Sequence, residues 1–280
     1  MDVKPIGVTL ILLIAGAFLI AGCTSTQPGS IPASTVAITP TPGSSPDSIL
    51  VCAGAGLKAP MQEIGQEFTR KFGIEVQYTY GGSGMLISQM NLPKKGDVFI
   101  PGSTVEFSTA QSQGLVDTSQ LIAYHVPVIA VKKGNPRNIT TITDFINPGL
   151  KVALGDANAT AIGKAGTKIF RKYNITAAVE KNVITRTPTI NELAVIMNLG
   201  QADAALLTLD QINPDTMEAI SIPASDNAVL IIPVGLTRFT KNPQNARKFA
   251  DFVASDAGKA IFVKHGFPSY PNQTYASVNP

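Results

Sequence analysis

Short apolar runs along this chain alternate with segments whose apolar residues recur at helical spacing. Ile49–Ala53 is an apolar run that ends in Gly54-Ala55-Gly56, and it is followed by Met61, Ile64, Phe68 and Phe72 at helical spacing. After Gly73, the segment Ile74–Tyr80 alternates apolar and polar residues with period two, as a strand does. The pattern therefore predicts a strand, a glycine-containing turn, a helix and a second strand.

The same alternation continues to the end of the chain. Gly81-Gly82-Ser83-Gly84 opens another helical pattern, and Thr189 with Glu192 has the spacing of a capping box. Pro127 lies inside one predicted strand, which suits an edge strand or a crossing between lobes. Further strands are expected at Asp97–Ile100, Tyr124–Lys132, Lys151–Leu154, Ala204–Leu209 and Ala228–Leu236, and further helices at Ala161–Tyr173, Thr189–Gly200, Asn245–Ser255 and Asp256–Lys264.

This order of elements predicts an α/β fold. Alternating strands and helices form mostly parallel sheets that are covered by helices on both faces. Ligands of such sheets bind where the carboxyl ends of strands meet the amino ends of helices.

The first 47 residues predict where the protein works. Lys4 precedes an uncharged apolar run from Pro5 to Ile20, and small residues lead directly into Cys23. This pattern is typical of a lipoprotein signal, so we expect residues 1–22 to be removed and Cys23 to be lipid-modified at the outer face of the cell membrane. The alternative is a membrane-spanning anchor, but the run is shorter than the roughly 20 residues that cross a bilayer.

Residues 23–47 have the composition of a tether. Thr24–Pro46 contains no charged residue and is rich in Ser, Thr and Pro, which cannot form a core. The remaining residues are numerous enough for two lobes. The net charge is +3, from 22 basic and 19 acidic residues, and gives no indication of nucleic-acid binding. Cys52 is then the one remaining cysteine, and its apolar strand predicts a core residue.

Four strand-to-helix turns share one chemistry. They are Ala53–Leu57, Gly82–Met85, Ala161–Gly163 and Thr189–Asn191. The first turn of a helix leaves about four N–H groups unpaired and carries roughly +0.5 of a charge. Each turn alone is compatible with an ordinary loop, but four converging turns would offer about +2 to a small dianion. Ser83 adds a hydroxyl donor.

Competing motifs fail in detail. Gly54-Ala55-Gly56 with Ala59 matches a loose dinucleotide fingerprint, but the second strand ends in Thr79-Tyr80 without the acidic residue that binds a ribose. The histidines, His125 and His265, are not near Cys, Asp or Glu at a metal or triad spacing, so we expect structural roles for them. The sequence therefore predicts no catalytic residue, no cofactor, no bound metal and no enzyme.

Several segments in order resemble a known family. They are Val51–Met61, Gly82-Ser83-Gly84 before a helix, Gly96–Ile100, Val152–Asp156, Phe249–Phe262 and His265-Gly266-Phe267. Together they resemble the molybdate-binding proteins of ABC importers, which have the type II periplasmic-binding-protein fold. The resemblance extends from Ile49 to Phe267.

The resemblance implies a two-lobe α/β fold, each lobe a mostly parallel sheet flanked by helices. It implies crossing segments near Ala123–Val128 and Pro223–Pro233. Lobe I would comprise residues 48–123 and 233–280, and lobe II residues 124–232.

The resemblance also implies an oxyanion site between the lobes. The first turn would contribute backbone donors at Ala55, Gly56 and Leu57, although such proteins have a serine at the position of Gly56. A tyrosine of the bacterial members corresponds to Leu207, which removes a polar contact and leaves Thr208 as a substitute. The remaining contacts implied by the resemblance would come from Ser83 and from the backbone N–H groups of Ile162 and Ile190. The turns themselves add Gly84 and Gly163 as neighbouring candidates.

The choice of ligand follows from hydrogen-bond chemistry. Hydrogen phosphate needs an acceptor, which Asp156 or Glu192 could supply, whereas molybdate, tungstate and sulfate need donors only. Lys58 and Lys164 lie near two of the turns and could add charge. We expect molybdate or tungstate, bound by a monomer that delivers it to an ABC permease and its ATPase. The alternatives are another small anion (sulfate, phosphate or a carboxylate) or an extracellular sensor or adhesion module that reuses the fold.

Overall fold

The computed structural model describes residues 48–279. The predicted signal peptide, the lipidation at Cys23 and the tether lie outside the described residues. Both sheets described below belong to one compact unit of the chain.

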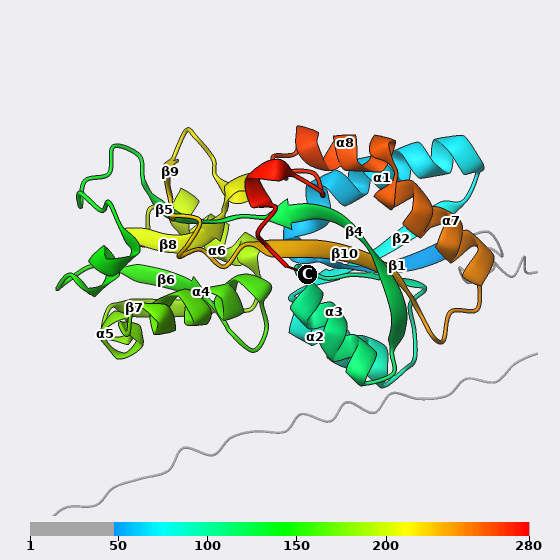
Figure 1. Cartoon of the computed structure of the whole chain (residues 1–280), viewed down its shortest axis with the longest axis horizontal. Coiled ribbons are helices and arrows are strands. Elements are labelled where there is room, and N and C mark those ends of the chain that lie inside the picture. The colour runs from blue at the N-terminus through cyan, green and yellow to red at the C-terminus, as the bar shows by residue number, and fades with distance from the viewer. Residues whose placement is uncertain (1–47, 280) are drawn as a thin grey trace, which may run out of the picture. The chain divides into compact units, whose positions relative to one another are not determined.

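The sheet of lobe I has five strands in the order β2-β1-β3-β10-β4 (Figure 1). β1 (Ser48–Gly54) lies between β2 (Glu75–Gly81) and β3 (Val98–Ile100), and both pairings are parallel. β10 (Leu230–Thr237) is antiparallel to β3 and to β4 (Val116–His125). Four of the five strands therefore run in one direction.

The sheet of lobe II repeats this arrangement in the order β7-β6-β8-β5-β9. β6 (Val152–Gly155) is parallel to β7 (Val183–Thr187) and β8 (Ala204–Thr208). β5 (Pro127–Lys132) is antiparallel to β8 and to β9 (Met217–Ser221). The reversed strand of each sheet, β10 in lobe I and β5 in lobe II, begins where the chain arrives from the other lobe. The other four strands run in the opposite direction, so they end at the boundary between the lobes.

The chain crosses between the sheets twice. Val126 alone separates β4 from β5, and residues 222–229 connect β9 to β10. The predicted single strand Tyr124–Lys132 is thus the end of one strand and all of another, with Pro127 at the start of the second. Tyr124 and His125 of β4 pair with Ile231 and Leu230 of β10 in the lobe I sheet, so the sheets divide two or three residues from the predicted lobe boundaries.

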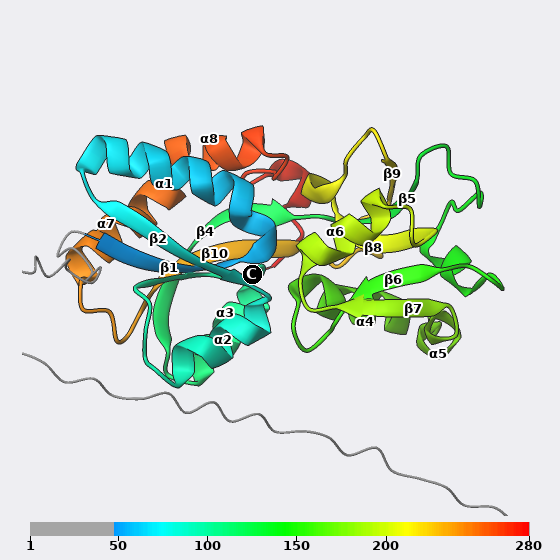
Figure 2. The same cartoon turned by 180° about the vertical axis from the view of Figure 1, so that it is seen from behind.

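Helices cover both faces of the lobe I sheet. α1 (Lys58–Phe72), α7 (Pro243–Ala254) and α8 (Asp256–Lys264) lie on one face, and α2 (Ser83–Asn91) and α3 (Thr104–Ser112) on the other, as both Figure 1 and Figure 2 show. Phe68 of α1 and Phe249 of α7 pack edge to face with ring centroids 5.0 Å apart. Their fully buried rings make this face a continuous apolar core.

Lobe II has a single apolar core. Ile162 and Ile169 of α4 (Ala161–Lys172) and Leu193 and Met197 of α6 (Ile190–Asn198) are buried in it. The short α5 (Thr176–Glu180) and four 3-10 turns complete the secondary structure of the described residues: η1 (Ala55–Leu57), η2 (Ile142–Ile146), η3 (Leu209–Gln211) and η4 (Gln273–Tyr275).

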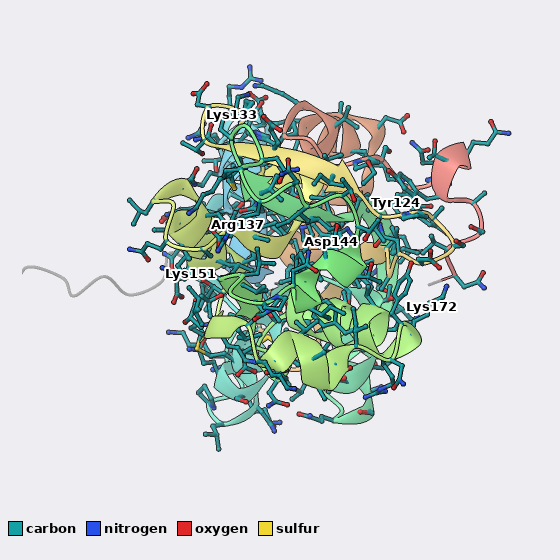
Figure 3. The ribbon with its side chains drawn as sticks, turned by 90° about the vertical axis from the view of Figure 1, so that its left-hand side faces the viewer. Tyr124, Lys133, Arg137, Asp144, Lys151 and Lys172 are labelled. Carbon is teal, nitrogen blue, oxygen red and sulfur yellow. The ribbon has the colours of Figure 1, made fainter. Side chains whose placement is uncertain are left out.

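The charges at the outer end of lobe II are held by local pairing. Asp203 is 3.1 Å from both Lys132 Nζ and Arg137 Nε, and it accepts the Lys151 N–H at 3.0 Å. Burial alone would raise the pKa of Asp203, but these hydrogen bonds outweigh it and hold the pKa below its ordinary value. Figure 3 looks at this end and shows Arg137 and Lys151 on the same side of it. The group ties the starts of β6 and β8 to the end of β5.

Within residues 48–279, every helix is too short or too polar to span a bilayer.

Cys52 is a core residue of β1, as predicted, with 4% of its surface exposed. Burial, and to a lesser extent the nearby Asp97 carboxylate, raise the pKa of its thiol to about 11. Only the thiolate is a nucleophile, so the native thiol should be inert near neutral pH.

We predict that Cys52 resists thiol reagents until the protein unfolds. In a Cys23→Ser variant Cys52 is the single thiol, so Ellman's reagent at about pH 8 should give little colour with native protein and one equivalent in guanidinium chloride. Rapid stoichiometric labelling of the native protein would contradict the burial described here.

Candidate functional site

The four predicted turns meet at one cavity between the lobes. The centres of water-sized spheres can occupy about 30 Å³ in it. Because an oxygen atom is about the size of a water molecule, this space suits the oxygens of one small anion better than an organic solute. Its lining comes from strand ends and helix starts of both sheets: Gly54, Ala55, Gly56, Gly81, Gly82, Ser83, Gly102, His125, Thr160, Ala161, Ile162, Ile190, Thr208 and Leu230.

Helices α4 and α6 of lobe II begin with free N–H groups, because the capping side chain of each helix accepts a hydrogen bond only from the N–H of its third residue. Thr160 Oγ1 accepts the Gly163 N–H at 3.0 Å, and Thr189 Oγ1 accepts the Glu192 N–H at 3.2 Å. The first two N–H groups of each helix have no intrahelical partner. Ile162 and Ile190 contribute such groups and line the cavity.

Ser83 is oriented by a backbone donor. Its Oγ accepts the Gly102 N–H at 3.0 Å, and the residue is 3% exposed. Since that oxygen is already accepting, the hydroxyl proton is free to donate elsewhere, and the cavity is beside it. α2 has no side-chain cap, so the Ser83 N–H also lacks a side-chain partner.

The first turn has no free space for the serine that the resemblance led us to expect. A Cβ at Gly56 would lie 2.8 Å from Ile190 Cγ2 of lobe II, so that side chain fills the space a serine would need. Ala55 and Gly56 nevertheless line the cavity with their backbone. The carbonyl oxygen of Gly56 accepts a hydrogen bond from Gln211 at 3.4 Å.

Three residues that the sequence assigned to the site do not line the cavity. Leu57 is fully buried in the lobe I core. The Gly84 N–H donates to the Ala159 carbonyl oxygen at 3.1 Å, and the Gly163 N–H is consumed by the Thr160 cap. Their N–H groups or side chains are therefore engaged elsewhere. Ala55, Gly56, Ser83, Ile162, Ile190 and Thr208 do line it.

The end of β8 explains the absent tyrosine contact. Leu207 is fully buried in the lobe II core, whereas Thr208 lines the cavity, because successive side chains of a strand point to opposite faces. Thr208 Oγ1 is completely buried and has no hydrogen-bond partner within the described residues. A buried hydroxyl without a partner is costly, so this oxygen indicates that a guest supplies one.

His125 lines the same cavity, which the sequence did not predict. It ends β4 and is 4% exposed, and its Nδ1 lies 3.1 Å from the Gly102 carbonyl oxygen. Its Nε2 has no hydrogen-bond partner within residues 48–279 and lies 3.8 Å from Asp210 Oδ1. A sequence signal did exist, since His125 lies in the predicted crossing segment, where a strand of this fold class ends at the ligand.

The other charged candidates lie outside the cavity lining. Lys164 Nζ lies 2.9 Å from the buried Glu106 Oε1, which connects α4 of lobe II to α3 of lobe I. Asp156 accepts the Asn158 N–H at 2.6 Å, and Glu192 accepts the Thr189 hydroxyl, so both serve their own turns. Lys58 is exposed and does not line the cavity. The cavity lining thus contains no carboxylate and no lysine or arginine.

The described residues contain no group of three His, Cys, Asp or Glu side chains that could hold a metal ion. The donors at the cavity are backbone N–H groups and hydroxyls, which suit an anion as the guest.

The lobes are closed on each other in this structure. A Cβ at Gly82 would lie 2.4 Å from the Pro188 carbonyl oxygen and 2.6 Å from that of Ala159. Both oxygens belong to lobe II, whereas Gly82 begins α2 of lobe I. The glycine therefore allows the backbones of the two lobes to touch beside the cavity.

Two lobes joined by two crossings, with a cavity where the strands end, define a type II periplasmic binding protein. The chain belongs to the bacterial extracellular solute-binding protein family, whose model matches residues 49–268.

Three relatives show what this family contains. A putative binding protein of Haemophilus influenzae is 29% identical over 77% of this chain and 88% of its own length. The molybdate-binding protein ModA of Mycobacterium bovis is 27% identical over 93% of this chain and 96% of its own length. A putative ABC transporter substrate-binding lipoprotein of Bacillus subtilis, YvgL, is 23% identical over 89% of this chain and 93% of its own length. All three names describe binding proteins, and the last names an ABC transporter, so the chain is a solute-binding protein and not an enzyme, as predicted.

Solved structures confirm the fold. The substrate-binding domain of a putative molybdenum ABC transporter from Clostridium difficile has a TM-score of 0.61 at 21% identity, covering 79% of this chain and 98% of that one. The sulfate-binding protein SubI of Mycobacterium tuberculosis has a TM-score of 0.71 at 16% identity, and the match covers 82% of this chain and 89% of SubI. The expected type II periplasmic-binding-protein fold is thus correct.

We predict that Gly82→Ala prevents full closure without harming either lobe. The backbone of Gly82 has φ −62° and ψ 139°, which alanine adopts freely, so unfolding free energy should change by less than about 0.5 kcal/mol. Small-angle scattering should show a larger radius of gyration than for the parent protein. The control is Ser88→Ala on the exposed face of the same helix. An unchanged radius for Gly82→Ala would show that the lobes close despite the added methyl group.

Proposed function

We propose that this chain is the binding component of an ABC importer and carries molybdate or tungstate between its lobes. The observation that supports this most strongly is the convergence of unpaired N–H groups and hydroxyls on a cavity whose lining has no carboxylate. A dianion accepts hydrogen bonds at every oxygen and donates none, so such a lining satisfies it fully.

The proposed contacts come from both lobes. Lobe I would contribute the N–H groups of Ala55 and Gly56 together with the hydroxyl and N–H of Ser83. Lobe II would contribute the N–H groups of Ile162 and Ile190 and the hydroxyl of Thr208. The starts of four helices add about +2 of dipole charge, which matches the two negative charges of the anion.

Binding at this boundary gives the receptor its signal. Because the donors are divided between two lobes, the anion gains all its contacts only when the lobes are closed. It therefore stabilises the closed form by its extra affinity for that form, and a permease that recognises the closed form accepts only a loaded receptor.

The relatives support this ligand class. ModA of Mycobacterium bovis is named for molybdate, and its similarity covers nearly the whole of both chains. The sulfate-binding neighbour has the same fold, so the fold is compatible with a tetrahedral oxyanion as ligand. Which oxyanion binds would then depend on the size of the cavity. Molybdate and tungstate share charge and shape and are proposed together.

The place of action follows from the part of the chain that precedes the described residues. We propose lipidation at Cys23 and anchoring at the outer face of the cell membrane, with residues 23–47 as the tether and the protein acting as a monomer. The Bacillus subtilis relative carries the word lipoprotein in its name, which supports this proposal.

His125 favours a second candidate function, the binding of hydrogen phosphate. Its Nε2 has no partner within the described residues and, in the neutral ring, would accept the phosphate proton. Molybdate has no such proton to donate. The two ligands therefore require different protonation states of the same ring.

Calorimetric titration with molybdate, tungstate, sulfate and phosphate tests the function. We expect tight binding of molybdate and tungstate, weaker binding of sulfate because the smaller anion leaves some donors out of range, and weakest binding of phosphate. Phosphate binding more tightly than molybdate would replace the proposed ligand, and no tight binding of any of the four would refute oxyanion transport.

We predict that Ser83→Ala weakens molybdate binding by roughly 1.5–3 kcal/mol, the usual contribution of a hydrogen bond to a charged group, or about 10- to 150-fold. The matched control is Ser88→Ala, which removes an exposed hydroxyl five residues further along α2. Equal affinities for the two variants would remove Ser83 from the site.

A further inference from the structure

His125 is the one side chain in the cavity lining that can change its charge near neutral pH. The ring lies where β4 ends, one residue before the chain crosses to lobe II, and is almost completely buried. Phe267 packs against it with ring centroids 5.1 Å apart. The ring is thus held in place with one nitrogen at the cavity.

The hydrogen bond at Nδ1 fixes the tautomer. The Gly102 carbonyl oxygen, 3.1 Å away, can only accept, so Nδ1 carries a proton. In the neutral ring Nε2 is then a lone pair at the cavity, which would repel an oxyanion. In the protonated ring Nε2 carries an N–H and a positive charge, which would bind one.

We infer that His125 is a ligand-contacting residue that takes up a proton when the dianion binds and donates its Nε2–H to an anion oxygen. This inference rests on the proposed function. In the binding step one proton moves from solvent to Nε2, and no covalent bond of the anion changes. The protein gains one positive charge from this proton, and the bound anion adds two negative charges.

The groups around the ring are compatible with a protonated state. Asp210 of η3 contributes the one carboxylate among the contacts that the described residues make with the ring, at 3.8 Å from Nε2. Its other oxygen accepts from the Gln211 amide at 2.6 Å, so the carboxylate is held beside the ring. The remaining neighbours are neutral: the Gly102 carbonyl, the Phe267 ring, and Gly56, where an added Cβ would lie 3.9 Å from Nε2. Lys164 is paired with Glu106 and does not line the cavity.

The ring would also select among anions by their protons. A dianion without a proton requires the charged ring, so its binding should be accompanied by proton uptake. Hydrogen phosphate would bind the neutral ring and leave its protonation unchanged. Counting protons therefore reports which kind of anion the cavity accepts.

The test is calorimetric titration of the full chain with molybdate at about pH 8, in two buffers that differ in ionisation enthalpy and are not oxyanions. The difference in apparent enthalpy gives the number of protons taken up, and we expect a measurable uptake of at most one proton, since one ring nitrogen is available to gain it. Affinity for molybdate should fall as the pH rises, because binding then includes the uptake of a proton by the ring.

Variants assign the proton. His125→Gln should abolish the uptake and flatten the pH profile, and Asp210→Asn should reduce the uptake because the charged ring loses its carboxylate neighbour. The control is His265→Gln, since His265 pairs with Glu63 at 2.8 Å and does not line the cavity. It should leave the uptake unchanged.

The outcomes separate this inference from the proposed function. Molybdate binding without proton uptake would overturn the role of His125 and leave the transport proposal intact, and this result needs no variant to fold. Uptake that persists in His125→Gln would assign the proton to another group. If none of the four anions binds, the proposed function and this inference both fail.

Discussion

The interaction on which the structure depends is the hydrogen bond that a buried backbone N–H must make. Each helix start leaves N–H groups without partners, and closing two lobes over them removes the water that satisfies them. Four of five strands in each sheet end at the boundary between the lobes, so the following turns put their donors there together. In the proposed function, an anion that accepts hydrogen bonds from both lobes would remove this cost and so favour the closed form.

Closure also depends on close backbone contact, and glycine is what permits it. Gly82 and Gly84 begin α2 against carbonyl oxygens of lobe II, at separations that leave no room for a Cβ. The contact is also polar, since Gly84 donates to Ala159. The pair of Lys164 with Glu106 adds a charged contact across the same boundary. Lys164 is partly exposed, so its pairing contributes little free energy, whereas Glu106 is buried and needs a cation when the lobes are closed. Such contacts position the lobes relative to each other beside the cavity.

The sequence was sufficient to predict the fold and the four turns but not the detailed use of each donor. A short apolar run located β1, helical spacing of apolar residues located α1, alternation located β2, and the capping-box spacing located the start of α6. The sequence pattern missed the first part of β4, where Asp117–Gln120 are polar and exposed, because an exposed strand has no apolar alternation. It placed Gly84 and Gly163 in the site because helix starts are donors in general, whereas the structure gives those two N–H groups to Ala159 and Thr160. It could not foresee that Ile190 fills the space beside Gly56, since that contact joins residues far apart in the chain.

The substitution of Leu207 for the expected tyrosine changes how the cavity handles charge. A tyrosine hydroxyl is a neutral donor over a wide pH range, and its loss leaves Thr208 and His125 as polar side chains with unpaired buried atoms at the cavity. The two are not equivalent, because a hydroxyl can rotate to donate or accept, while the Gly102 carbonyl fixes the tautomer of His125. Asp210 does not line the cavity, so its charge acts on the ring and not directly on the anion. A charged ring beside that carboxylate is close to neutral as a pair, so the helix starts still determine the positive potential inside the cavity. On the inference made for His125, the site would keep its dependence on backbone donors while this one histidine makes anion binding depend on the uptake of a proton.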